Sequence, residues 1–241
     1  MKSDLTVIIP CRDERSTIVK VIHEVDEVFQ HHNIFGSILV VDDHSTPPLA
    51  IGDLWHRGMH VKPNLVRNPL SPGLASAFKT GVYNAYSPHV IFMSGDGTDD
   101  PAAIPLYYRY LMKGYFCVFG QRRCLFRHPS KYPVVKFFLN RLGNRLISLF
   151  FDRSYSDYTD IFKGYFLTDA YSVFSCKSMG YGISLELCLR AILSNRSYKV
   201  FSIKPRARVS GRSKFRLWHD VPDYFLVLLR CLKLKYGKKN Y

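Results

Sequence analysis

Short runs of β-branched and aliphatic residues alternate with helical segments, and this alternation constrains the fold most strongly. The runs at 5–9, 37–41 and 89–93 have the composition and length of buried strands. Apolar residues recur at helical intervals over 15–30, and a second helix is predicted over 74–85. This order is typical of βαβ units. We therefore predict an α/β fold with a mostly parallel central sheet flanked by helices.

Each of the three predicted strands ends in a polar cluster that contains acids. The clusters read PCRDE, DDHS and SGDGTDDP. Asp and Ser after a strand are also ordinary caps of helices and turns, but three such clusters together favour a binding site. Ligands of open α/β sheets bind outside the carboxyl ends of the strands. We predict a ligand site at this edge of the sheet.

The second half of the chain is less regular. The pattern predicts strands over 115–120 and 199–203, the latter at a sheet edge, and helices over 134–151 and 183–192. The last segment mixes aromatic and aliphatic residues with Lys and Arg, which predicts an amphipathic helix with a basic tip. We expect residues 1–217 to form one domain and residues 218–241 to form this C-terminal helix and tail.

Charge and composition narrow the possible partners and location. The 34 Lys and Arg residues against 19 Asp and Glu give a net charge of +15, which predicts an anionic partner. No aromatic-basic or zinc motif accompanies the charge, so we expect no nucleic-acid partner. The six cysteines form no CxxC pair, which indicates neither a zinc site nor a disulfide framework and favours the cytosol. The longest apolar runs are too short to span a membrane, so a membrane role would be peripheral.

Three common nucleotide and hydrolase motifs are absent from the sequence. There is no GxxxxGK[ST] loop, no GxGxxG after the first strand and no GxSxG turn. A P-loop phosphotransferase, a dinucleotide oxidoreductase and an α/β-hydrolase are therefore disfavoured.

The acids at the strand ends suit a nucleoside diphosphate. Its phosphates need a divalent cation, and Mg²⁺ or Mn²⁺ prefers carboxylate and phosphate oxygens. Asp42 and Asp43 with Glu14 would accept hydrogen bonds from the nucleoside. The metal candidates are the three carboxylates of the third cluster: Asp96, Asp99 and Asp100.

Several motifs of the first half resemble glycosyltransferase family 2. The family's P-x-Y-N-E stands as PCRDE at 10–14, and its V-V-D-D-x-S is intact at 40–45. The G-x-x-x-A-x-x-x-G pattern is present as Gly73, Ala77 and Gly81. In the D-x-D metal motif, Ser94 occupies the first position and Asp96 the second, as in a branch of the family that carries M-A-D-G-S-D-D-P.

Motifs of the second half resemble the dolichol- or undecaprenyl-phosphate sugar transferases of that family. Residues 120–122 stand for G-S-R, and 136–144 resemble the helix R-x-x-x-S-R-x-x-N. Residues 157–165 match D-x-T-N-x-F-K-x-Y, 181–191 match G-F-E-I-S-L-E-L-x-x-K-A, and 208–215 match R-x-x-G-x-S-K-F. The resemblance runs in one order from about residue 5 to residue 218 and implies a GT-A, Rossmann-like domain.

The resemblance also implies roles for individual residues. It implies Mg²⁺ or Mn²⁺ as the cofactor, with Asp96 as the metal ligand. The implied catalytic residues are Asp96, Glu186, Asp157, Arg122, Arg208 and Lys214. The implied donor-binding and cofactor-binding residues are Pro10, Arg12, Glu14, Asp42, Asp43, Ser45, Gly73, Lys79, Gly95, Lys136 and Ser213.

These roles lead to one predicted reaction and two alternatives. The prediction is an inverting transfer of sugar from a UDP- or GDP-sugar to a polyprenyl phosphate, by an enzyme peripheral to the cytoplasmic face of the membrane. A sugar-hydroxyl acceptor in polysaccharide synthesis would need a base, for which Asp157, Asp160 and Glu186 are candidates. Glu186 also stands four residues before Arg190, so a structural ion pair is its other interpretation. A non-catalytic nucleotide-sugar-binding relative is the second alternative.

Overall fold

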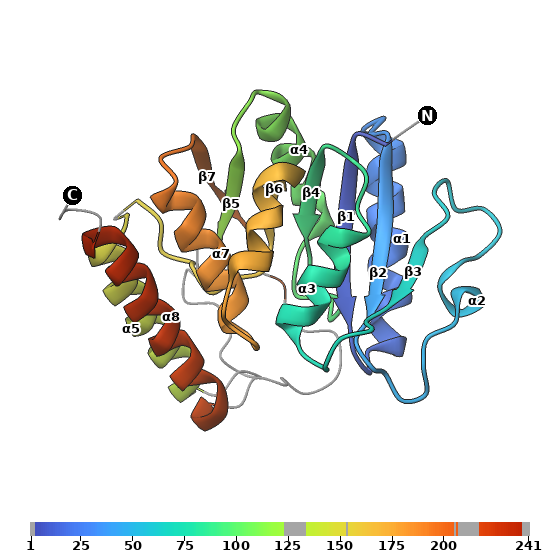
Figure 1. Ribbon diagram of the computed structural model, residues 1–241. Helices are drawn as coiled ribbons and strands as arrows, with labels where there is room; N and C mark the ends of the chain where they lie inside the picture. Colours follow the sequence, from blue (N-terminus) through green and yellow to red (C-terminus); the bar gives the residue numbers. More distant parts are fainter. Residues whose placement is uncertain (1–2, 123–133, 153, 205, 207–216, 238–241) are drawn as a thin grey trace.

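The protein is a single sheet covered by helices on both faces (Figure 1). The computed structural model describes residues 3–122, 134–152, 154–204, 206 and 217–237, with the backbone alone for 134–140 and 217–219.

Within the described residues, seven strands form the sheet in the order β3-β2-β1-β4-β6-β5-β7. Strand β6 runs antiparallel to its neighbours β4 and β5, and the other pairings are parallel. The predicted mostly parallel sheet is thus confirmed, with β7 at one edge as expected. The strands are β1 (Leu5–Cys11), β2 (Gly36–Asp42), β3 (Asn64–Arg67), β4 (His89–Phe92), β5 (Cys117–Arg122), β6 (Lys163–Phe166) and β7 (Tyr198–Ile203).

The helices that the sequence predicts are present, and shorter ones join them. The longer helices are α1 (Arg15–His31), α3 (Leu74–Tyr83), α4 (Ile104–Met112), α5 (Val134–Phe150), α7 (Gly182–Leu193) and α8 (Leu217–Gly237). The short ones are α2 (Ile51–Leu54), α6 (Leu167–Ala170), η1 (Pro101–Ala103) and η2 (Tyr171–Ser175). The sequence did not predict β3, β6, α2, α4 or α6.

Two hydrophobic cores lie on opposite faces of the sheet. Along β1, Val7 and Ile9 point into the core under α1 and α4, and Ile8 points into the core under α3 and α7. Every residue of β1 is buried, because helices cover both faces of the strand. This double burial explains why nearly every residue of β1 is apolar.

Helix α3 packs directly on strand β1. A Cβ atom added at Gly81 would lie 2.4 Å from Cγ2 of Ile8, so a larger residue would push the helix away from the strand. Ala77, one turn earlier, is fully buried. The G-x-x-x-A-x-x-x-G spacing therefore serves close helix–strand contact, which fixes where α3 begins relative to the strand ends.

Helix α8 lies beside α5 and α7 at one end of the molecule (Figure 1). Val227 and Cys231 of α8 are buried in the same core as residues of α7. Within the described ranges, no helix is long and apolar enough to cross a bilayer. The domain boundary at residue 217 stays a prediction.

Candidate active site

The loops after β1 and β2 are tied to each other at the carboxyl ends of the strands. The backbone N–H of Asp13 donates to Ser45 Oγ at 3.0 Å, and the N–H of Thr46 donates to Asp13 Oδ1 at 2.8 Å. Asp13 and His44 adopt positive φ angles of 49° and 61°, which Asp and His tolerate better than most residues. Ser45, predicted to bind the donor, therefore also helps to hold the two loops together.

Asp42 organises the loop that follows β2. Its side chain is 1% exposed, and its two oxygens accept from the N–H groups of Ser45 at 3.0 Å and Leu49 at 3.1 Å. A carboxylate that accepts backbone N–H groups rigidifies a loop. Nucleoside binding by Asp42 stays a prediction, and the hydrogen bonds show a structural task for the same group.

Asp43 joins the end of β2 to the start of α3. Its Oδ1 accepts from Asn68 Nδ2 at 2.7 Å, and its Oδ2 accepts from the N–H of Gly73 at 3.0 Å. Asn68 in turn accepts from Thr80 Oγ1 at 3.0 Å. Gly73 has a φ of 152°, which a side chain rarely adopts. The structure thus brings Asp43 together with Asn68 and Gly73, which lie 25 and 30 positions further along the chain.

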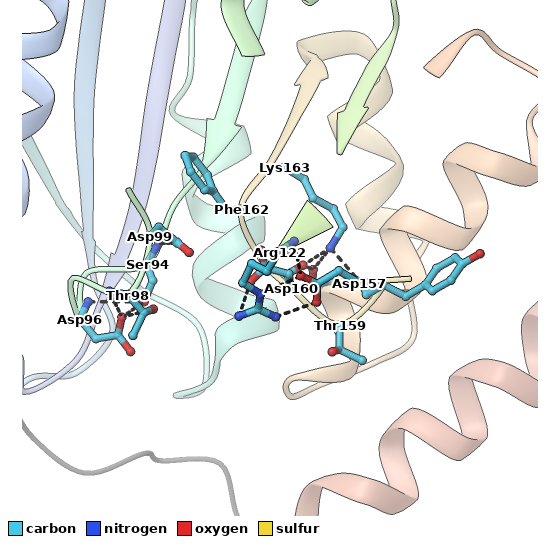
Figure 2. Close-up of polar contacts among 12 residues, drawn as sticks. Ser94, Asp96, Thr98, Asp99, Arg122, Asp157, Thr159, Asp160, Phe162 and Lys163 are labelled. Atoms are coloured by element: carbon cyan, nitrogen blue, oxygen red, sulfur yellow. Dashed lines mark hydrogen bonds and ion pairs between the residues drawn. The ribbon is translucent and has the colours of Figure 1, made fainter. Parts of the chain in front are cut away.

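Asp96 sits in a tight turn after β4 (Figure 2). Its Oδ1 accepts from Ser94 Oγ at 2.7 Å and from the N–H and hydroxyl of Thr98 at 3.0 and 2.6 Å. Ser94, at the first position of the metal motif, therefore donates a hydrogen bond to the remaining carboxylate and adds no second negative charge. The nearby Asp99 accepts from the N–H of Ser94 at 2.7 Å, and Asp100 pairs with Arg206 at 3.0 Å.

The turn around Asp96 suits a cation that is bound largely by substrate. In the described part of the chain, no three His, Cys, Asp or Glu side chains come together as a metal site. Mg²⁺ is often held by one or two carboxylates together with substrate phosphates. Asp96, whose Oδ1 is held by Ser94 and Thr98, fits this type of site.

Three other predicted donor-binding residues meet beside this turn. A Cβ atom added at Gly95 would lie 3.0 Å from Glu14 Oε2 and 3.3 Å from the carbonyl oxygen of Pro10. Pro10, Glu14 and Gly95 are therefore neighbours at the ends of β1 and β4. Arg12 is exposed, and its Nε lies 3.9 Å from Asp13 Oδ2. Lys79 is half-buried on α3.

Arg122, at the end of β5, is partly exposed and forms an ion-pair cluster with two buried acids (Figure 2). Its Nε and Nη2 donate to the two oxygens of Asp157, each at 2.7 Å, in a bidentate pair. Its Nη1 lies 3.3 Å from Asp160 Oδ1. The structure thus unites Arg122 with Asp157, both predicted to be catalytic. The guanidinium of this predicted catalytic residue is engaged by carboxylates.

Lys163 fixes the loop that carries Asp157 and Asp160, and its role was not predicted from the sequence. Its buried ammonium donates to the carbonyl oxygens of Tyr158, at 3.1 Å, and Asp160, and to Ser184 Oγ at 3.0 Å. Burial lowers the pKa of Lys163. The Lys of the F-K-x-Y motif could have indicated this role, because a Lys buried in an apolar strand needs hydrogen-bond acceptors.

Burial shifts the titration of this cluster. It raises the pKa of Asp160 to about 6, although the charge of Arg122 acts in the opposite direction. The pKa of Asp99 is raised well above its usual value by burial and by the charge of Asp160. Burial disfavours the charge on Arg122, but Asp160 and Asp157 outweigh it and raise the pKa of Arg122. Asp160 Oδ2 is buried and has no hydrogen-bond partner among the described residues.

Glu186 is completely buried on α7, and both of its oxygens are occupied. Oε2 accepts from the N–H groups of Lys177 at 3.0 Å and Ser178 at 2.9 Å. Oε1 accepts from Nε and Nη2 of Arg190 at 3.2 and 3.1 Å. The i, i+4 pair that the sequence offered as the other interpretation is present. The geometry therefore favours a structural role, and a catalytic role stays a prediction.

Some predicted site residues cannot be placed. Arg208, Ser213 and Lys214 lie outside the described residues, as does the side chain of Lys136 on α5.

The sheet order and the helical layers on both faces define an α/β fold of the GT-A kind, with acid-bearing loops at the strand ends. The chain belongs to glycosyl transferase family 2, whose family model matches residues 6–174. No curated protein matched the chain.

Solved structures with a similar fold include glucosyl-3-phosphoglycerate synthase from Mycobacterium tuberculosis. Its complex with Mn²⁺, UDP and phosphoglyceric acid is 16% identical, with a TM-score of 0.72 over 95% of this chain and 78% of that one. Its complex with Mg²⁺ and UDP is 16% identical, with a TM-score of 0.73 over 95% and 79% of the two chains. At this identity the likeness shows the fold. The lipid-phosphate branch stays a prediction.

Proposed function

We propose that the protein transfers a sugar from a UDP- or GDP-sugar to a polyprenyl phosphate, with inversion at the anomeric carbon, at the cytoplasmic face of a membrane. The donor would bind where β1, β2 and β4 end, among Glu14, Gly95 and Asp96. Buried free thiols at the five described cysteines are compatible with a reducing compartment.

Asp96 would hold Mg²⁺ or Mn²⁺ together with the donor diphosphate. The bound cation supplies charge that stabilises the departing nucleoside diphosphate. The Ser94 and Thr98 hydrogen bonds orient the Asp96 carboxylate for this task. The fold relative from Mycobacterium tuberculosis binds UDP with Mn²⁺ or Mg²⁺, which supports a donor of this class.

The occupied carboxylates of two candidate bases favour a phosphate acceptor over a hydroxyl acceptor. Both oxygens of Asp157 accept from Arg122, and both oxygens of Glu186 accept from backbone and Arg190. Two of the three candidate bases are therefore engaged. A phosphate oxygen is already anionic near neutral pH and needs no base. It would form the new bond to the anomeric carbon while the bond to the diphosphate breaks, and the diphosphate would leave with the electron pair.

Asp160 supports a second candidate function, transfer to a sugar hydroxyl. Its Oδ2 has no hydrogen-bond partner among the described residues, and its pKa is raised to about 6. A base of that pKa is well matched to proton removal near neutral pH. In this reaction the hydroxyl oxygen would attack the anomeric carbon while the bond to the diphosphate breaks, the diphosphate would leave with the electron pair, and the hydroxyl proton would pass to Asp160.

Transfer assays with the Asp160→Asn variant separate the two candidates. Radiolabelled UDP- and GDP-sugars would be offered to the wild type, the variant and an Asp53→Asn control, each with polyprenyl phosphate or with an oligosaccharide. The proposal predicts label in the lipid fraction for all three proteins. Label that enters only the oligosaccharide, and that Asp160→Asn reduces at least about 100-fold, would establish the second candidate instead.

A further inference from the structure

Helices α5 and α8 each expose a row of apolar side chains, and the two rows together are here called the α5–α8 face. It is defined by Leu142, Leu146, Leu149, Phe225, Leu226 and Leu229, each exposed over 47% or more of its surface. On α5 the leucines recur at i, i+4 and i+7, and on α8 the apolar residues stand at i, i+1 and i+4, so each set lies along one side of its helix. Large apolar patches on a protein surface mark sites of interaction.

The two helices are held side by side. The ammonium of Lys235 on α8 donates to the carbonyl oxygen of Phe150 on α5 and lies 5.5 Å from the ring centre of Phe151. The other side of α8 is anchored in the protein core through Val227 and Cys231. Figure 1 shows the pair at the end of the molecule beyond α7. The exposed rows therefore belong to one docked helical layer.

The charges around this face have one sign. The sequence of α5 contains no acid, and both acids of α8 are turned toward the protein. Asp220 is 7% exposed, and Asp223 Oδ2 accepts from Ser178 Oγ at 2.6 Å. Among the described side chains of the two helices, the exposed charges are cations: Arg141, Arg145 and Lys233.

We propose that the α5–α8 face docks on an anionic lipid bilayer. Apolar side chains would enter the acyl boundary while the flanking cations meet the lipid phosphates. A second copy of this chain is a poorer occupant, because each copy carries a net charge of +15 and brings the same cations to the interface. This inference deepens the proposed function and rests in part on its lipid acceptor.

The docking face is physically connected to the donor site. Asp223 of α8 also accepts from the N–H of Gly182 at 3.1 Å, which ties α8 to segment 177–182. On the other side of that segment, a Cβ atom added at Gly73 would lie 3.0 Å from the carbonyl oxygen of Met179. A bilayer that contacts α8 would therefore lie one segment away from the turn in which Gly73 contacts Asp43.

Vesicle sedimentation tests the face directly. Wild-type protein, the double variant Phe225→Asp/Leu229→Asp and the control Met112→Asp would be mixed with phosphatidylcholine vesicles with or without about one-third phosphatidylglycerol. Met112 is 57% exposed and lies on α4, over the opposite face of the sheet. We expect binding that needs the anionic lipid, a loss of at least about tenfold in the double variant and no change in the control.

Three results would overturn the inference: no wild-type binding to anionic vesicles, equal binding by the double variant, or an equal loss in the control. A wild-type dimer in light scattering that the double variant abolishes would assign the face to a second copy. Binding of UDP and GDP with Mn²⁺, measured on the same proteins, distinguishes a failure of the docking face from a failure of the proposed function. An intact donor site with no vesicle binding rejects the docking face alone.

Discussion

The two halves of the site hold their acids in different ways. In the first half, Asp42 and Asp43 accept mainly from backbone N–H groups and an amide side chain of nearby loops. In the second half, Asp157 and Asp160 converge on the single guanidinium of Arg122. The first arrangement spreads stabilisation over many hydrogen bonds, and the second concentrates it in one side chain. Loss of one residue should therefore have unequal consequences in the two halves.

Arg122→Met should give the largest loss of stability. It leaves two buried carboxylates without their common partner, and breaking a buried ion pair from one side costs about 3–5 kcal/mol. Urea unfolding measures the free energy of unfolding of the variant against wild type. Arg67→Met serves as the control, because Arg67 is mostly exposed and its ion pair with Asp42 is long, with 4.0 Å between Nε and Oδ2. A loss as small as that of the control would remove the contrast between the halves.

Glu186→Gln should come second. The new amide would place N–H groups against donors, either the N–H groups of Lys177 and Ser178 or the guanidinium of Arg190, at a cost of about 1.5–3 kcal/mol. Thermal unfolding and the steady-state kcat would be measured together. A large fall in kcat with unchanged stability would contradict the structural role and restore Glu186 as a catalytic residue.

Asp43→Ala should cost less, about 1–3 kcal/mol, because it leaves neutral N–H groups without an acceptor and no unpaired charge, and Asn68 keeps its hydrogen bond to Ser76. Hydrogen exchange should accelerate at Gly73 and the following turn of α3. Glu27→Ala, at an exposed position of α1, should change stability by less than about 0.5 kcal/mol. If Asp43→Ala lowers the free energy of unfolding as much as Arg122→Met does, the stability of the first half depends on a single residue as strongly as that of the second.

Asp160→Asn should have the smallest effect on stability, and this effect should be visible mainly in how stability depends on pH. The folded protein raises the pKa of Asp160 to about 6 from a usual 3.8. The stability contributed by this group is therefore complete below its usual pKa and is lost as the pH rises through about 6. The variant lacks this loss, so its melting temperature should rise relative to wild type over that window. A difference that does not vary with pH would refute the raised pKa.

The sequence revealed the parts of the fold that depend on local pattern. Strand β1 is buried on both faces, which gives a continuous apolar run, and α1 carries an apolar stripe at regular spacing. Strand β6 has only the residues KGYF, with Lys163 buried by tertiary contacts, so no periodicity identifies it. Strand β3 is equally short and only partly buried. Strands β3 and β6 pair with strands that lie far away in the chain, so local sequence does not indicate their pairing.

The sequence placed acid-bearing clusters at the strand ends, where the structure also has them, and ligand binding there stays a prediction. The contact between Asp43 of the second cluster and Gly73 appears only in the structure. The sequence could not show that the Arg122 guanidinium faces Asp157, because 35 positions separate them and either phosphate or carboxylate would suit it. The i, i+4 spacing of Glu186 and Arg190 did predict their pair, since helix geometry alone brings them together.

Calorimetric titration of UDP and GDP tests most directly whether the turn around Asp96 is the donor site. Wild type and Asp96→Asn would be titrated with Mn²⁺ and with a chelator, and Asp152→Asn would serve as the control. The account predicts that Mn²⁺ strengthens binding of one nucleotide at least about tenfold in wild type and the control, and that Asp96→Asn abolishes this gain. Equal affinity with and without Mn²⁺, or a metal effect that persists in Asp96→Asn, would contradict it.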